Sequence, residues 1–312
     1  MQVLDVIDER AIDELTARRE FFWLDLVDPS HEQLAALAKR FGWHPLALED
    51  MQKRGQRPKL DGYGDHMLLV FYGARQLGHD APVVIEVHLV VSGDWVVTVR
   101  HGGCNELEEL RARLPADHTK GEQFVVYRIL DTLTDTFFPV LEAIDDEIDE
   151  LEDAIVLGPT DEQLQRIFHL KRSLVTLRRI ITPQRDLAAR TIDDIAELPG
   201  LDPGTRDYFR DVYDHLIRLS DMVDSYRDLL TGAMDVYLST VSNRTNVVMK
   251  QLTLVATIFL PITALTGFFG QNFGWLVLHI RSQWAFMVFG VGGIVLSSAL
   301  LFVWFHRSRF LD

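Results

Sequence analysis

Two apolar stretches near the C-terminus, residues 247–269 and residues 284–305, constrain this chain more than any other feature. The hydrocarbon core of a bilayer, about 30 Å thick, is spanned by roughly 20 apolar helical residues. Each stretch reaches that length, and Lys250 near the start of the first is the one charge inside either. The pattern predicts a membrane protein that ends in a helical hairpin. One hairpin cannot enclose a pore, so a conducting path requires several copies of the chain.

The residues before the hairpin are acidic, and the whole chain has a net charge of −15 and a pI of about 5.1. A nucleic-acid surface needs clustered Lys and Arg, so nucleic acid is not expected as a partner, whereas divalent cations are. The single cysteine, Cys104, rules out an intrachain disulfide and is expected to be buried. No phosphate-binding glycine motif or catalytic constellation is present, so we expect neither an organic cofactor nor an enzyme.

Basic residues predict the orientation of the hairpin. Arg244, Lys250, Arg307 and Arg309 flank its outer limits, while the connecting loop contains only Arg281 and His279. The first residues contain neither the basic region nor the apolar region of a signal peptide, so we expect no cleaved signal peptide. We therefore expect a multi-pass protein of the cell (inner or plasma) membrane with the lipid bilayer as partner and both termini in the cytoplasm.

The first 120 residues alternate between strand-like and helical patterns. β-branched and aromatic runs at residues 21–26, 66–74, 83–91 and 94–100 predict strands. Between the first two, Ser30 caps a predicted helix that ends at Gly42. Residues 1–120 are thus predicted to form a cytoplasmic α/β domain.

Residues 121–246 have a helical pattern that is interrupted at Gly158-Pro159 and at residues 198–203. The pattern predicts a helix over 122–156 and a second over 160–196 with a kink at Pro183. A third, very long helix is expected from Thr205 to about Phe269. These helices would form a funnel or stalk, whose apolar stripe packs either against other copies or within the chain.

Four segments carry a resemblance to a known family: FGWHPLALED, QRPKLDGY, FRDVYDH and the run from MDVYLSTVSNRTN to FFGQN. In order and spacing they resemble the CorA-type magnesium transporters. The resemblance implies an α+β membrane protein that assembles as a homopentamer. In it, residues 247–269 form an inner ring and residues 284–305 an outer ring, with an external loop at 270–283 and a cytoplasmic tail at 306–312.

The resemblance also implies which residues line the pore. On the long helix these are Asp235, Asn246, Met249, Leu252, Leu260 and Thr263. A ring of Met249 and Leu252 would form an apolar gate, although apolar packing between helices explains these two residues equally well.

The external loop begins with Gly270, Gln271 and Asn272, whereas the family signature is Gly-Met-Asn. Asn272 retains an amide that could hold the water shell of Mg²⁺. The rest of the loop lacks acidic residues and contains His279 and Arg281. The signature therefore supports the fold more firmly than it supports magnesium uptake.

Regulatory Mg²⁺ is implied at subunit interfaces, where the matching carboxylates are Glu49, Asp50, Asp131 and Asp211. The alternative is that these carboxylates pair with basic residues, and Arg54, Arg57 and Lys59 are near Asp50 in the sequence. Five histidines without metal-ligand spacing are interpreted as hydrogen-bonded structural residues; they are His44, His66, His88, His169 and His215.

The first functional hypothesis is a passive channel for hydrated Mg²⁺, with Co²⁺ and Ni²⁺ as further ions, closed by cytoplasmic metal. The second is a zinc transporter of the same fold, with proton coupling, which the change at Gln271 and the basic loop motivate. The third is a membrane metal sensor that does not conduct and needs only the interface carboxylates.

Overall fold

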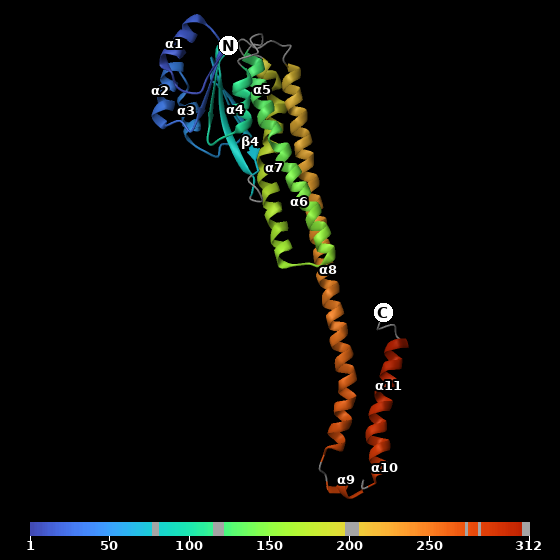
Figure 1. Cartoon of the computed structure of the whole chain (residues 1–312). Helices are drawn as coiled ribbons and strands as arrows, with labels where there is room; N and C mark the ends of the chain where they lie inside the picture. Colours follow the sequence, from blue (N-terminus) through green and yellow to red (C-terminus); the bar gives the residue numbers. More distant parts are fainter. Residues whose placement is uncertain (77–80, 115–121, 197–205, 272–273, 280–281, 308–312) are drawn as a thin grey trace. The chain divides into compact units, whose positions relative to one another are not determined.

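The computed structural model describes residues 1–76, 81–114, 122–196, 206–271, 274–279 and 282–307 (Figure 1). Its internal contacts divide the chain into two compact units, Met1–Tyr237 and Leu238–Asp312. The first unit contains the sheet and the second contains the apolar C-terminal helices.

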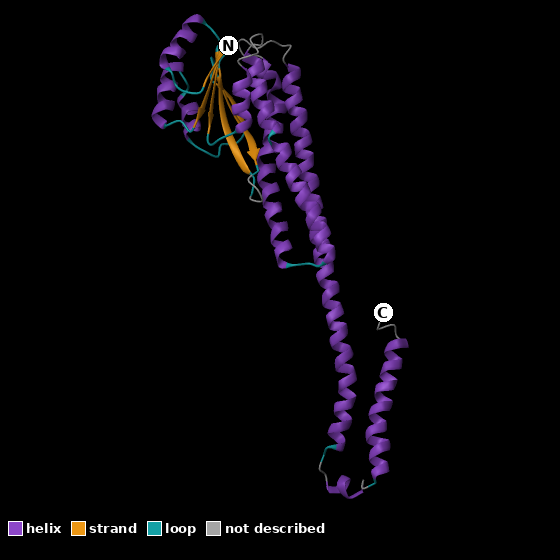
Figure 2. Ribbon diagram, viewed as in Figure 1, coloured by secondary structure: helices purple, strands orange, loops and turns teal. Residues whose placement is uncertain are grey.

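The N-terminal unit is built on a mixed sheet of six strands in the order β1-β2-β6-β5-β4-β3 (Figure 2). The strands are β1 Gln2–Leu4, β2 Phe22–Val27, β3 Lys59–Gly62, β4 Met67–Arg75, β5 Val83–Val91 and β6 Trp95–Arg100. β1, β2 and β6 are parallel, and β6, β5, β4 and β3 are antiparallel neighbours. All four predicted strands are present. β1 and β3 were not predicted because they are too short to show an apolar run.

Helices cover both faces of this sheet. In Figure 1, α1 to α3 lie to the left of the sheet, and α4 and α5 lie to its right. The helices are α1 Glu9–Arg18, α2 His31–Phe41, α3 Pro45–Gln52, α4 Asn105–Arg113, α5 Glu122–Asp135, α6 Phe137–Leu157, α7 Asp161–Ala196 and α8 Arg206–Phe269. As predicted, α2 begins at a capping box on Ser30 and ends at Gly42, whose φ of 67° is left-handed.

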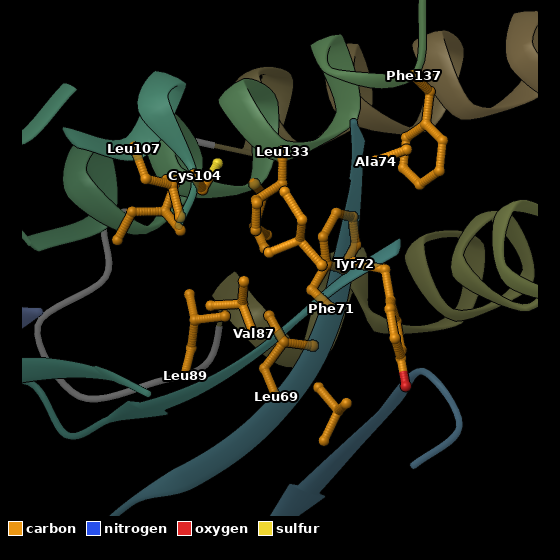
Figure 3. Packing of buried hydrophobic residues seen from close by; sticks show 14 of the residues in the cluster. Leu69, Phe71, Tyr72, Ala74, Val87, Leu89, Cys104, Leu107, Leu133 and Phe137 are labelled. Atoms are coloured by element: carbon orange, nitrogen blue, oxygen red, sulfur yellow. The ribbon is translucent and has the colours of Figure 1, made fainter. Parts of the chain in front are cut away.

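One hydrophobic core joins the sheet to the long helices. The cluster of buried side chains runs from Ile12 to Tyr237, so the predicted α/β layer and much of the predicted funnel pack as one body. Figure 3 shows Leu69, Val87 and Leu89 of the sheet facing Leu107 and Leu133 of the helices. Cys104 forms no disulfide and lies in the same core, so its predicted burial is confirmed.

The predicted helix over 122–156 is two helices, α5 and α6, separated at Thr136. Pro139 in the first turn of α6 explains the break, because proline has no N–H to donate to the carbonyl of Asp135. The backbone of Thr136 stays close to helical, with φ −61° and ψ −20°. The two helices therefore continue in nearly one direction.

The C-terminal unit contains the end of α8, followed by α9 Gly274–His279, α10 Gln283–Ala285, the π-helix η3 Phe286–Val291 and α11 Gly292–Arg307. By length and composition, two helical segments could span a membrane: Arg206–Phe268, through its apolar part, and Gln283–Phe305. The π-helical turn in the second segment and the short helix α9 in the loop were not predicted. α7 remains helical through Pro183.

Candidate functional site

Two helices of the N-terminal unit bring acidic residues together. Asp131 and Asp135 lie one turn apart on α5, and Asp211 and His215 lie one turn apart on α8. His215 Nδ1 is 3.8 Å from Asp131 Oδ1 and 3.7 Å from Asp135 Oδ1. On the other side of the ring, His215 Nε2 is 3.8 Å from Asp211 Oδ1.

The geometry of this cluster suits a metal ion. The side-chain ligand atoms of Asp131, Asp135 and His215 all lie within 4.8 Å of one another. His215 Nδ1 is buried and has no hydrogen-bond partner in the described part of the chain. A divalent cation between the carboxylates would supply that nitrogen with a partner, and carboxylate oxygen and imidazole nitrogen are both common metal ligands. Water bridging the same atoms is a competing explanation of the geometry.

Burial governs the electrostatics of the cluster. Asp131 is 6% exposed, and burial raises its pKa, as do the nearby charges of Asp135 and Asp211. Arg128 and His215 oppose this rise, and Arg128 Nη1 donates to Asp131 Oδ2 at 2.9 Å. Burial also raises the pKa of Asp135. A bound cation would reverse the penalty, because positive charge favours the ionised carboxylates.

Tyr127 closes one side of the cluster. Its hydroxyl donates to Asp211 Oδ2 at 3.4 Å. Burial, together with the charges of Asp131 and Asp211, raises the pKa of Tyr127 to about 12. The phenol therefore stays protonated and acts as a donor to the carboxylate.

The other two predicted carboxylates lie outside this cluster. Asp50 pairs with Lys59 at 2.6 Å, and Glu49 pairs with Lys53. Burial lowers the pKa of Lys59, but hydrogen bonds to Asp50 and Asp61 outweigh it, so the net shift is upward. Within the single chain, Asp50 thus has the lysine partner that was weighed as the alternative to metal.

Two residues of the cluster were missed in the sequence. Asp135 was not selected. His215 was interpreted as a hydrogen-bonded structural histidine, which is wrong for its Nδ1 atom among the described residues, as it also is for Nδ1 of His88 in the sheet. The sequence contained a pattern that predicts both residues: Asp135 follows Asp131, and His215 follows Asp211, by four positions. Such spacing places both side chains on one helix face.

The predicted pore residues of the C-terminal unit share an uncovered face of α8. Met249, Leu252 and Leu260 are 55%, 62% and 74% exposed. Asn246 and Thr263 are exposed as well.

Part of the opposite side of α8 is less exposed. Leu254 and Leu265 are partly buried, and a Cβ placed on Gly293 of α11 would lie 3.8 Å from the Leu265 side chain. Gly293 of α11 therefore lies close to the side of α8 that does not carry the predicted pore residues. Asp235, the remaining predicted pore residue, is exposed in the N-terminal unit.

At the end of α8, the Gly270 N–H donates to the Thr266 carbonyl oxygen at 2.8 Å. A Cβ on Gly270 would lie 3.0 Å from that same oxygen, which favours glycine there. Gln271 is exposed, and its N–H donates to the Phe268 carbonyl at 3.3 Å. Asn272 lies outside the described residues.

Comparisons with known proteins agree on one family. The family model described as "CorA-like Mg2+ transporter protein" matches residues 18–307. The cobalt/magnesium transport protein CorA of Thermotoga maritima is 35% identical over 280 residues, covering 87% of this chain and 78% of that protein. The zinc transport protein ZntB of Yersinia enterocolitica is 26% identical, covering 93% of this chain and 88% of that protein. The complete structure of the CorA magnesium transporter from Methanocaldococcus jannaschii superposes with a TM-score of 0.79 at 26% identity, covering 92% of this chain and 90% of that one.

Proposed function

The chain belongs to the CorA-like Mg²⁺ transporter family, and from this premise we propose that it is a passive channel for hydrated Mg²⁺. Co²⁺ and Ni²⁺ would follow the same hydrated route. The channel would be a ring of five copies in a cell membrane, with both termini in the cytoplasm. The observation that supports it most is that Asn246, Met249 and Leu252, which share one face of α8, are all exposed in a single copy.

A ring of copies explains why this face is apolar and yet uncovered. Met249, Leu252 and Leu260 would meet their counterparts around the axis, while α11 of each copy would pack outside. Met249 and Leu252 would then form a narrow apolar ring that conducts only when it widens or wets. The amides of Asn246 would face water, which satisfies their hydrogen bonds.

Such a channel needs no nucleotide to drive inward flow. A membrane potential of about 100 mV supplies about 2.3 kcal/mol for each elementary charge, hence about 4.6 kcal/mol for a divalent ion. This magnitude is enough to concentrate a divalent cation strongly on the negative side.

The cluster of Asp131, Asp135 and His215 is proposed as the cytoplasmic sensor. Metal bound there would stabilise whichever conformation presents the ligands together, so rising internal metal would favour closure. Asp211 stands beside this cluster. Glu49 and Asp50 would join the regulatory site across a subunit boundary, exchanging their lysine partners for metal.

Uptake by the purified protein in liposomes, under an imposed inside-negative potential, tests the proposal. We expect Mg²⁺ uptake that stops when the potential is removed. The Gln271→Met variant, which restores the family signature, is expected to conduct Mg²⁺ at least as well. Absence of Mg²⁺ uptake from both proteins would contradict the proposal.

A zinc transporter is the second candidate, because the similarity to the zinc transport protein ZntB also covers most of the chain. Zn²⁺ uptake with no Mg²⁺ uptake in the same liposomes would establish it, and a pH gradient that changes the rate would indicate proton coupling. Metal binding without uptake of either ion would favour the sensor that does not conduct.

A further inference from the structure

A second charged site lies in the N-terminal unit, between α7 and the loop that joins α3 to β3. An open pocket of about 980 Å³ is lined there by this loop, by β4 and β5, by α7 and by one residue of α8. Small-molecule sites commonly measure roughly 300–1,000 Å³. The lining includes none of the candidate metal ligands Asp131, Asp135 and His215.

Arginine dominates the lining. The five arginines are Arg57, Arg178, Arg179, Arg190 and Arg227, against two carboxylates, Glu86 and Asp186. This excess stands out in a chain whose net charge is −15. The pocket is therefore a local basic site on an acidic protein.

Both oxygens of the Glu86 carboxylate already have hydrogen-bond partners. It accepts hydrogen bonds from the backbone N–H groups of Gly55 at 2.6 Å and Gln56 at 3.0 Å, and it bonds His88 Nε2 at 2.8 Å. Burial opposes ionisation of Glu86, but these hydrogen bonds outweigh it and lower its pKa. Glu86 thus holds the loop to the sheet through both of its carboxylate oxygens.

The second carboxylate is also occupied. Asp186 pairs with Arg185, which does not line the pocket, at 2.9 Å. Arg178 and Arg227 share one carboxylate, that of Asp224, at 3.1 Å each. Two guanidinium groups on one carboxylate leave one positive charge uncompensated.

In the described part of the chain, the remaining three arginines have no carboxylate partner. Arg57 and Arg179 are exposed and form no ion pair within the described residues. Arg190 donates from Nε to the backbone oxygen of Asp186 at 3.1 Å and makes no ion pair there either. These guanidinium groups come from two elements and line one pocket, so an anion there could be held from two sides.

We propose that this pocket binds the di- or triphosphate group of a soluble phosphorylated metabolite. The planar fork of a guanidinium matches two phosphate oxygens, and such charge-assisted hydrogen bonds are about twice as strong as neutral ones. A diphosphate carries enough charge to engage Arg57, Arg179 and Arg190 together. The pocket leaves further room for the rest of the molecule.

Isothermal titration of the full-length protein in detergent with pyrophosphate and with ATP tests the proposal. The buffer contains a chelator, so that removal of metal by the ligand cannot produce the signal. We expect both compounds to bind and adenosine, which lacks phosphate, not to bind. The double change Arg57→Gln and Arg179→Gln is expected to weaken binding by about tenfold or more.

The matched control is Arg172→Gln, which removes an exposed arginine from the same helix, two turns before Arg179 and outside the pocket lining. Its affinity should stay within about twofold, because Arg172 is exposed and outside the pocket, and surface changes of this kind rarely alter stability. An equal loss in the control, or no pyrophosphate binding by the unchanged protein, would overturn the proposal. The titration measures binding and does not depend on ion transport. Its failure can therefore be distinguished from a failure of the liposome uptake experiment.

The phosphate of a lipid headgroup could bind the same arginines. A second experiment distinguishes a lipid headgroup from a soluble ligand. The titration is repeated in nanodiscs of phosphatidylcholine and in nanodiscs of phosphatidylglycerol. Equal affinity for pyrophosphate in both supports a soluble ligand. Weaker binding in the anionic lipid, seen in the unchanged protein and absent from the double variant, would assign the pocket to lipid and overturn the soluble ligand.

Discussion

At the scale of single residues, one nitrogen atom distinguishes the candidate sensor from an ordinary acidic surface. Acidic groups gather on many helices without metal, but a buried imidazole nitrogen without a hydrogen bond carries a desolvation cost. His215 Nδ1 is such an atom within the described residues, and oxygens of Asp131 and Asp135 lie 3.8 and 3.7 Å from it. A cation at that point would remove the cost for all three groups.

The Asp131→Asn change tests the sensor. Because burial raises the pKa of Asp131, its ionised form is unfavourable in the metal-free fold, and the neutral amide should not lower the metal-free Tm. Mg²⁺ at about 100 times its Kd should stabilise the unchanged protein by about 2.7 kcal/mol. We expect the variant to lose most of this Mg²⁺-induced rise in Tm, and chelator to erase it in the unchanged protein.

The control for this experiment is Asp228→Asn, which removes an exposed carboxylate from α8, the helix that carries His215, away from the cluster. It should keep the full Mg²⁺ response. An Asp131→Asn protein that still gains Tm as the unchanged protein does would exclude Asp131 as a ligand.

Cys104 gives a prediction about reactivity and pH. Its side chain is fully buried, and burial raises its pKa from 9.0 to about 11. The folded state therefore holds the thiol proton more tightly than the unfolded state. This difference in proton affinity contributes about 2 to 3 kcal/mol to the free energy of unfolding. The contribution is fully present below pH 9 and is lost as the pH rises from 9 to about 11.

Thiol labelling at pH 8 measures this protection. The native protein should react slowly and the denatured protein fast, whereas an exposed Ser225→Cys site should react fast in both. Fast labelling of native Cys104 would show that the core around it opens readily.

At the scale of elements, the junction of α5 and α6 fixes the helices to the sheet. Thr136 Oγ1 accepts a hydrogen bond from the Ala74 N–H of β4 at 2.9 Å. The neighbouring Gly73 allows this approach, since a Cβ there would lie 2.8 Å from Thr136 Oγ1 and 3.1 Å from Leu133 Cδ2. The helix break that Pro139 causes thus coincides with a backbone contact to the sheet.

Gly73→Ala should therefore destabilise the N-terminal unit. The added methyl group forces strand and helix apart, which typically costs about 1 to 3 kcal/mol. Gly62→Ala on β3 is the matched control, because no atom lies within 4 Å of its added Cβ, and its φ is ordinary. Thermal unfolding of the two variants should show a lower Tm for Gly73→Ala alone; equal values would contradict the close packing.

At the scale of the whole molecule, a single copy leaves a large apolar surface on α8 and α11 uncovered. Lipid can cover such a surface, but lipid cannot satisfy the amide of Asn246, which lies on the same helix face as Met249. Assembly around an axis would satisfy both. The number of copies remains a prediction from the family resemblance.

Cysteine cross-linking tests this assembly. Met249 and Ile258 are nine positions apart, which places them on opposite sides of α8 at about 100° for each residue. Under mild oxidation, Met249→Cys should form disulfide-linked pairs between copies, and Ile258→Cys should not. Native mass measurement should return five copies. A monomer, or stronger cross-linking at position 258, would contradict the proposed ring.

The sequence alone determined the two candidate membrane spans, the strands at the sheet centre, the α2 caps and the family. Each of these depends on local composition, periodicity or motif order, because transfer of a segment into lipid and formation of a helix turn are largely local. Tertiary structure decided which distant side chains meet: Asp135 with His215, Asp50 with Lys59, and Arg57 with the arginines of α7. These contacts join segments far apart along the chain, so they depend on how the helices and the sheet pack. No short segment of the sequence is sufficient to predict that packing.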